Sequence, residues 1–147
     1  MIAMKYTLGF SPCPNDTFIF DALINRKIDT EGLELEVILE DIQQLNERAI
    51  CNNKDLIKVS AGVLPLIWNN FLILPSGGAM GYGSGPLVIT RPELNGKTPS
   101  VDDYIVALPG ENTTAHFLFE MAYPGVKQKR FRMFSLIEDE VLNGSAD

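Results

Sequence analysis

The sequence is poor in the residues from which metal sites and disulfide frameworks are built. Its 147 residues include two cysteines, Cys13 and Cys51, and one histidine, His116. No Cys-x-x-Cys pair and no histidine cluster occurs, so the sequence offers no ligand set for zinc. We therefore expect neither a metal site nor a disulfide scaffold.

Long apolar runs and basic clusters are missing too. No apolar run approaches the roughly 18 residues of a membrane helix, and the N-terminal residues lack the pattern of a signal peptide. Lysines and arginines number 12 against 19 aspartates and glutamates, for a net charge of −7. Because nucleic acids and anionic membranes attract basic surfaces, we expect neither as a partner. The lack of a signal-peptide pattern, a membrane-length apolar run and a disulfide framework leads us to expect a cytoplasmic protein.

The most informative stretch that is present is Ser11–Phe18, with the sequence Ser-Pro-Cys-Pro-Asn-Asp-Thr-Phe. It lies between an apolar run at 6–10 and a helical pattern at 18–24. Two prolines stiffen the turn, and Asn15 or Asp16 is expected to cap the helix. A turn of this kind exposes backbone N–H groups and favours a bound anion. The alternative is an ordinary strand-to-helix connection.

The rest of the chain alternates between strand and helix patterns, which predicts an α/β fold with a largely parallel sheet. Strands are expected at 33–39, 56–59, 71–74, 87–90, 105–108 and 130–135, and helices at 42–51, 60–68, 113–123 and 136–142. Asp41 is the expected N-cap of the helix at 42–51, whose apolar face carries Leu45 and Ala49.

Turn-rich segments mark the expected domain organisation. Residues 92–103, with three turn signals, are interpreted as the connection between a first lobe at 1–91 and part of a second lobe at 104–147. The glycines of residues 77–85 lack the spacing of a nucleotide-binding loop and lead into a predicted strand. They indicate a bend or close backbone packing instead.

Three strand-to-helix turns are candidates for ligand binding: those at Asp16, Ser60 and Thr113–Thr114. Ligands of open α/β sheets bind outside the carboxyl ends of the strands, so we expect Ser11, Asp16, Ser60 and Thr114 to line one cleft. A helix end contributes roughly 0.3–1 kcal/mol to anion binding, whereas micromolar affinity needs about 8 kcal/mol. Burial of a ring or closure of two lobes must supply the difference, which favours an aromatic carboxylate over phosphate or sulfate.

Few residues are candidates for proton chemistry. His116 lies in the first turn of its predicted helix, where it either faces the cleft or is exposed or packed, and the second is commoner. Cys13 is either a reactive thiol at a helix start or a small buried apolar residue, and the second is commoner. Asp16 is expected to be a cap rather than a general base.

The Ser11–Phe20 block closely resembles the opening signature of the 1,4-dihydroxy-6-naphthoate synthase family of the futalosine route to menaquinone. Further blocks of the same family follow in order at 39–41, 45–46, 58–60, 76–79, 85–88, 109–110 and 113–115. The resemblance therefore covers nearly the whole chain.

The resemblance implies a two-lobe fold of periplasmic-binding-protein type II and a carbon–carbon lyase. That enzyme converts cyclic dehypoxanthine futalosine to 1,4-dihydroxy-6-naphthoate without metal or organic cofactor. Its substrate-contacting stretches match Lys58, Val59 and Ser60, and Thr113, Thr114 and Ala115. With the turn residues Ser11, Asn15 and Asp16, these form the predicted substrate-binding set.

The resemblance also implies that the chain is a fragment. The general-base histidine of the family lies on a strand that would follow Asp147, and His116 does not occupy its position. We therefore expect the fragment to be inactive, marginally stable and prone to self-association. The alternatives are a chorismate dehydratase-like enzyme of the same fold and a non-catalytic protein that binds small organic anions.

Overall fold

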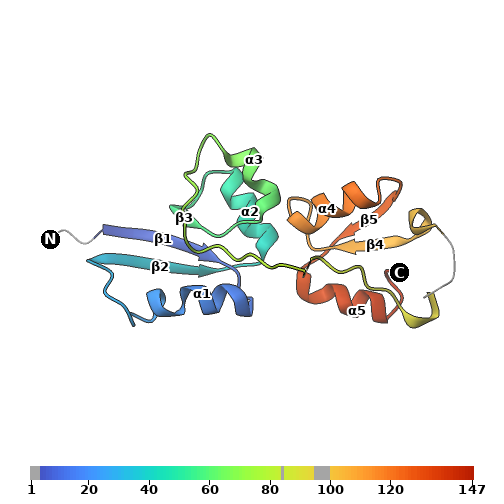
Figure 1. The fold of residues 1–147 in the computed structure, drawn as a ribbon, viewed down its shortest axis with the longest axis horizontal. Helices are drawn as coiled ribbons and strands as arrows, with labels where there is room; N and C mark the ends of the chain where they lie inside the picture. The colour runs from blue at the N-terminus through green and yellow to red at the C-terminus, as the bar shows by residue number, and fades with distance from the viewer. Residues whose placement is uncertain (1–3, 84, 95–99) are drawn as a thin grey trace. The chain divides into compact units, whose positions relative to one another are not determined.

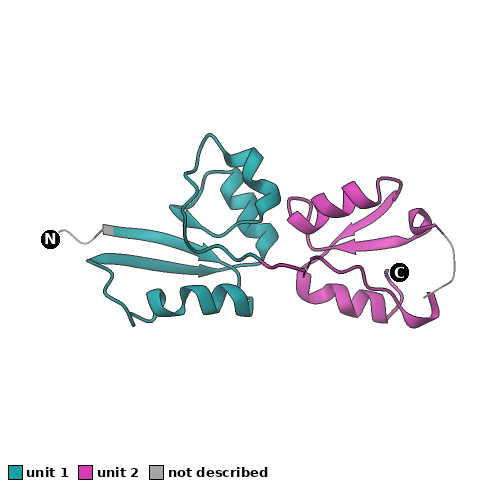
Figure 2. Ribbon diagram, in the orientation of Figure 1, with its two compact units in different colours: residues 1–80 teal, residues 81–147 magenta. Residues whose placement is uncertain are grey.

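The computed structural model describes residues 4–83, 85–94 and 100–147 (Figure 1). The chain divides into two compact units, Met1–Met80 and Gly81–Asp147 (Figure 2). This division lies before the boundary at 91–92 expected from the sequence. Thr90 Oγ1 donates to the backbone carbonyl of Asp147 at 2.7 Å, and Arg91 forms an ion pair with the Asp147 carboxylate at 2.9 Å. These contacts tie the segment before residue 92 to the second unit.

The first unit contains a three-stranded parallel sheet in the order β2-β1-β3. Its strands are β1 (Met4–Phe10), β2 (Leu33–Leu39) and β3 (Leu56–Ile57), and α1 (Pro14–Ile24) and α2 (Ile42–Ile50) connect them in turn. This alternation confirms the predicted α/β class with parallel strands. All strands of the sheet therefore end at one edge, where the turns at residues 11–16 and 58–60 follow β1 and β3.

Helix α2 is anchored at its start and along one face. The Asp41 carboxylate accepts from the N–H of Gln43 at 2.9 Å, and the Gln44 side chain accepts from the N–H of Asp41 in a capping box. The predicted N-cap is thus confirmed. Leu45 and Ala49 are fully buried, and a Cβ on Gly9 would lie 3.1 Å from Leu45 Cδ2. The glycine lets the helix pack closely on β1.

A tight helical turn follows β3. Residues Ala61–Val63 form a 3-10 turn that runs into the four-residue α3 (Leu64–Ile67), with Pro65 in its first turn. Val63 and Ile67 pack with Ala49 into one buried cluster. The helix predicted at 60–68 is thereby confirmed in position, although its first turn is 3-10 rather than α.

The second unit holds a two-stranded parallel sheet of β4 (Ile105–Leu108) and β5 (Gln128–Phe131). Its helices are α4 (Thr114–Ala122) and α5 (Ile137–Leu142), and short 3-10 turns span Pro92–Leu94, Val101–Asp103 and Phe134–Leu136. Leu108, Phe119 and Val126 form its buried cluster. The strand predicted at 130–135 is shifted: β5 pairs with β4 from Gln128 to Phe131 only, and a 3-10 turn begins at Phe134.

Two predicted strands do not form. Residues 71–74 and 87–90 have no assigned strand, and the side chains of Leu72 and Leu87 are each 85% exposed. A strand needs a neighbour that pairs with its backbone, and no described segment pairs with either one. Between them, Gly77 and Gly83 have positive φ angles of 78° and 71°, which supports the predicted bend. The predicted turn at 95–99 lies outside the described residues.

Candidate functional site

The turn after β1 starts α1 one turn earlier than expected. The N-cap is Cys13, with extended backbone angles and no side-chain cap, and Pro14 is the first helical residue. Proline is favoured there because its missing N–H would have had no partner in the helix. The prediction that Asn15 or Asp16 caps the helix is therefore wrong. Asn15 is exposed, and Asp16 is the third residue of the helix.

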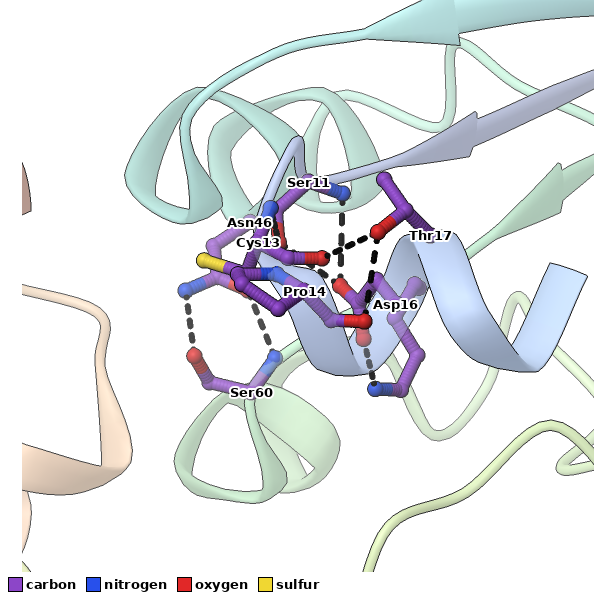
Figure 3. Close-up of polar contacts among 8 residues, drawn as sticks. Ser11, Cys13, Pro14, Asp16, Thr17, Asn46 and Ser60 are labelled. Carbon is purple, nitrogen blue, oxygen red and sulfur yellow. Dashed lines mark hydrogen bonds and ion pairs between the residues drawn. The ribbon is translucent and has the colours of Figure 1, made fainter. Parts of the chain in front are cut away.

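Asp16 instead organises a buried polar network, drawn in Figure 3. Its side chain is almost completely buried, and Oδ2 accepts from the Ser11 hydroxyl at 2.8 Å and from the Ser11 N–H at 3.3 Å. Its other oxygen, Oδ1, accepts from the Lys58 ammonium at 2.8 Å. Buried carboxylates persist only when they are paired and hydrogen-bonded. Both oxygens have donors, so Asp16 holds Ser11 and Lys58 in place.

The Lys58 ammonium brings a positive charge to this edge of the sheet. Lys58 follows β3, and its backbone N–H donates to the Gly9 carbonyl at 2.8 Å. An ammonium has three N–H donors, and within the described part of the chain only Asp16 accepts from it. Since its side chain is 21% exposed, the remaining donors can reach a ligand with negative charge.

Ser60 is held by a second buried polar residue, Asn46 on α2. Asn46 Nδ2 donates to Ser60 Oγ at 3.0 Å, and Asn46 Oδ1 accepts from the Ser60 N–H at 2.9 Å (Figure 3). Asn46 is completely buried. Its role at the site was not predicted from the sequence. The available signal was its position on the apolar face of the helix, four residues after Ile42 and three before Ala49.

Two other predicted residues have different surroundings. Val59 packs against the cluster of Ala49, Val63 and Ile67, so it supports the turn through apolar contacts. Cys13 is exposed, which contradicts the expected buried apolar role. Its exposure follows from the N-cap position, where Pro14 starts the helix at the surface. The first unit thus brings together Ser11, Asp16, Lys58 and Ser60.

The predicted residues of the second unit lie at the start of α4. Thr113 is its N-cap: the buried hydroxyl accepts from the His116 N–H at 3.3 Å and donates to the Gly110 carbonyl at 2.8 Å. Thr114 and Ala115 are partly exposed. The hydroxyl of Thr113 is engaged within the turn, so this residue shapes the turn. That Thr114 shares a cleft with Ser60 stays a prediction.

His116 is engaged at both ring nitrogens. Nδ1 lies 2.7 Å from the Glu111 carbonyl, and Nε2 lies 3.2 Å from the Glu120 carboxylate. The Lys129 ammonium donates to the same carboxylate, and this bond is the main cause of the lowered pKa of Glu120. These contacts pack His116 against residues of its own unit, which is one of the two commoner alternatives expected from the sequence, exposed or packed. Within the described residues, no cluster of histidine, cysteine and acidic side chains suits a metal ion.

Among the described residues, no helix has the length and apolar character to cross a bilayer.

Comparisons with known proteins give a consistent result. A family model described as menaquinone biosynthesis matches residues 6–147. A 1,4-dihydroxy-6-naphthoate synthase of Thermus thermophilus is 42% identical over 118 residues, which are 80% of this chain and 42% of that protein. The synthase of Streptomyces coelicolor is 41% identical over 124 residues, which are 82% of this chain and 41% of that protein.

One solved structure is also similar. The crystal structure of a protein from Archaeoglobus fulgidus matches with a TM-score of 0.89 and 30% identity, covering 100% of this chain and 53% of that one. The chain therefore spans about half of that structure, and about two-fifths of the length of the curated relatives that it matches.

Proposed function

Because this chain belongs to the menaquinone biosynthesis family, we propose that it supplies the substrate-holding part of a 1,4-dihydroxy-6-naphthoate synthase. Both curated relatives carry that name. The reaction we propose is the carbon–carbon lyase step that converts cyclic dehypoxanthine futalosine to 1,4-dihydroxy-6-naphthoate. The names of the relatives favour this function over chorismate dehydration and over binding without chemistry.

The observation that carries the proposal is the pair of donors that follows β3. The Lys58 ammonium is paired on one side with Asp16 and partly exposed on the other. Ser60, two residues further on, has its backbone N–H bonded to Asn46. An ammonium and a hydroxyl at this spacing suit a carboxylate, since charge-assisted hydrogen bonds are about twice as strong as neutral ones.

We further propose that the two units belong to a two-lobe fold of periplasmic-binding-protein type. Its support is that each unit carries its own parallel sheet and that helical turns follow the strands at candidate residues of both units. The proposed substrate-binding residues are Ser11, Asp16, Lys58 and Ser60 of the first unit and Thr114 and Ala115 of the second.

The proposal extends to the environment of the reaction. We place the enzyme in the cytoplasm, with an aromatic carboxylate as its small-molecule partner and without a metal or organic cofactor. The acidic surface, with a net charge of −7, supports a small substrate over a nucleic acid or an anionic membrane. The 147 residues alone are proposed to be inactive, since they match only two-fifths of the curated relatives.

A direct test assays the full gene product and the 147-residue chain with cyclic dehypoxanthine futalosine, and follows the naphthoate by chromatography. We expect turnover by the full product alone. Lys58→Met should weaken binding of the naphthoate by roughly ten- to a hundredfold, as expected when a charged hydrogen-bond donor is lost. Lys127→Met, which removes an exposed lysine of the second unit, is the matched control.

Two results would contradict the proposal. One is a full product that binds the naphthoate equally well with and without Lys58. The other is a full product that forms no naphthoate under anaerobic conditions, in which the dihydroxy product is not oxidised.

A further inference from the structure

The orientation of the Asn46 carboxamide is determined by its two contacts with Ser60. The Ser60 backbone N–H can only donate, so the atom 2.9 Å from it must be the carboxamide oxygen. The carboxamide nitrogen then faces Ser60 Oγ at 3.0 Å. This nitrogen has no lone pair to accept with, so Ser60 Oγ is the acceptor in that contact.

The direction of this bond determines what the Ser60 hydroxyl can do. With Asn46 donating to Oγ, the Ser60 hydrogen points away from Asn46, and no described residue accepts it. The neighbouring Ser11 hydroxyl differs, since it donates to Asp16 and accepts from the Cys13 N–H. Of these two serine hydroxyls, the one on Ser60 is therefore left as a donor.

We propose that Asn46 is a positioning residue that commits the Ser60 hydroxyl to donate to an acceptor oxygen of the ligand. The inference rests on the proposed function, because it takes the ligand to be an aromatic carboxylate bound beside Lys58. The acceptor is a carboxylate or carbonyl oxygen, and a ligand that offers an N–H or O–H to Ser60 is disfavoured. Asn46 does not touch the ligand in this arrangement; it acts through Ser60.

The surroundings of Asn46 suit this role. It is completely buried on α2, between Leu45 and Ala49, which are themselves fully buried. The capping box at Asp41 fixes the start of the same helix. A side chain held this firmly keeps the Ser60 hydroxyl in one direction, so less rotational freedom is lost when a ligand binds.

The discriminating variant is Asn46→Asp in the full gene product, with binding of 1,4-dihydroxy-6-naphthoate measured anaerobically by calorimetry. The new side chain has the same shape, but its ionised carboxylate accepts from Ser60 at both oxygens. The Ser60 hydroxyl then turns toward residue 46 and no longer serves the ligand. We expect affinity at neutral pH to fall roughly ten- to a hundredfold, about as much as in Ser60→Ala.

A double variant separates this mechanism from repulsion by the added charge. If Asn46 acts through Ser60, Asn46→Asp should have little further effect in the Ser60→Ala background. If the charge acts on the ligand directly, the loss should be the same in both backgrounds, and the inference is overturned. Asn53→Asp adds a carboxylate at an exposed position on the turn after α2 and serves as the matched control.

The affinity of Asn46→Asp for the naphthoate should also depend on pH, which it would not do if Asn46 had a merely structural role. The introduced carboxyl donates to Ser60 Oγ when protonated and accepts from it when ionised. The affinity of Asn46→Asp relative to wild type should therefore recover as pH falls through the pKa of that carboxyl, whereas Ser60→Ala should show no recovery. A constant ratio would overturn the inference.

Three further outcomes are decisive. If Ser60→Ala weakens binding and Asn46→Asp does not, the positioning role is wrong while the proposed function stands. If wild type does not bind the naphthoate, both are wrong. If Asn46→Asp does not fold, Asn46→Ser, which keeps a short polar side chain, replaces it. Full wild-type affinity in that variant would also overturn the positioning role.

Discussion

At the residue scale, the candidate site depends on buried polar groups that satisfy one another. Asp16 has donors at both oxygens, from Ser11 and Lys58, and its contact with Lys58 joins positions 42 residues apart in the sequence. A buried ion pair of this kind stabilises the fold little more than an apolar pair of the same shape would. Removing one partner, however, destabilises the fold strongly. Its presence in this turn is better explained by the placement of Lys58 than by stability.

Asp16→Asn should destabilise the protein by about 1–3 kcal/mol, because Lys58 loses its counter-ion and meets an amide donor instead. This loss of stability is smaller than the loss expected for a fully buried ion pair, because the Lys58 side chain is 21% exposed to solvent. Urea unfolding monitored by circular dichroism measures the change. Glu34→Gln, at an exposed position on β2, is the control. A loss no larger than that of the control would show that the network is not built around Asp16.

At the scale of single elements, local capping sets the position of α2 and therefore of Asn46. The Asp41 side chain accepts from the Gln43 N–H, and the Gln44 side chain accepts in return from the Asp41 N–H. Asp41→Ala should cost about 0.5–2 kcal/mol of unfolding free energy, whereas Asp41→Ser, another good N-cap, should cost much less. Equal losses in the two variants, measured by thermal unfolding, would argue against a capping role.

A second element-scale contact joins β1 to the turn before β3. The Asp55 carboxylate accepts from the N–H of Thr7 at 2.8 Å and from its hydroxyl at 2.9 Å, and the Asp55 N–H donates to the same hydroxyl oxygen at 3.1 Å. The hydrogen bond from the Thr7 N–H is the main reason that the pKa of Asp55 lies below its ordinary value, and the bond from the Thr7 hydroxyl is the second. These bonds keep the short β3 in register with β1.

The pKa of Asp55 is lowered in the folded state. The stabilisation of the fold by its ionised carboxylate is therefore fully present above the unfolded-state pKa of about 3.9. It is lost as pH falls through the lower folded-state pKa. Asp55→Asn should therefore be less stable than wild type at neutral pH, and the difference should shrink below about pH 4. Urea unfolding at several pH values measures it. A difference that stays constant with pH would mean that the charge of Asp55 is not involved.

At the scale of the whole molecule, each unit leaves much apolar surface uncovered. Leu72 and Ile73 in the first unit and Leu87 and Val88 in the second are exposed, at 85%, 54%, 85% and 61%. Segments with this exposure and no strand partner favour association with other polypeptides. The self-association expected from the sequence follows from the same surfaces and stays a prediction.

The isolated 147-residue chain should associate as its concentration rises and should bind a hydrophobic dye, as measured by light scattering and dye fluorescence. Leu72→Lys combined with Leu87→Lys should reduce both effects. Ile28→Lys changes an exposed residue outside these segments, with 53% exposure, and is the control. A monomeric wild-type chain that melts cooperatively would contradict the prediction.

The sequence by itself determined the elements whose signals are local. Alternation of apolar and acidic residues predicted β2, which spans the expected residues Leu33–Leu39. A capping residue before an apolar face predicted α2, and an apolar run predicted β4. The turn at Ser11 and Asp16 was also found from the sequence, because a strand pattern, two prolines and a helix pattern occur in immediate succession.

Only the tertiary structure decided how these local pieces act on one another. Asp16 was expected to cap its own helix, but the fold places the Lys58 ammonium beside it. Asn46 joined the site because α2 packs where its carboxamide meets Ser60, 14 residues further along the chain. The apolar patterns at 71–74 and 87–90 predict strands, yet a strand forms only when another backbone pairs with it. Periodicity and capping act within a few residues, whereas these outcomes depend on which distant groups the packed elements bring into contact.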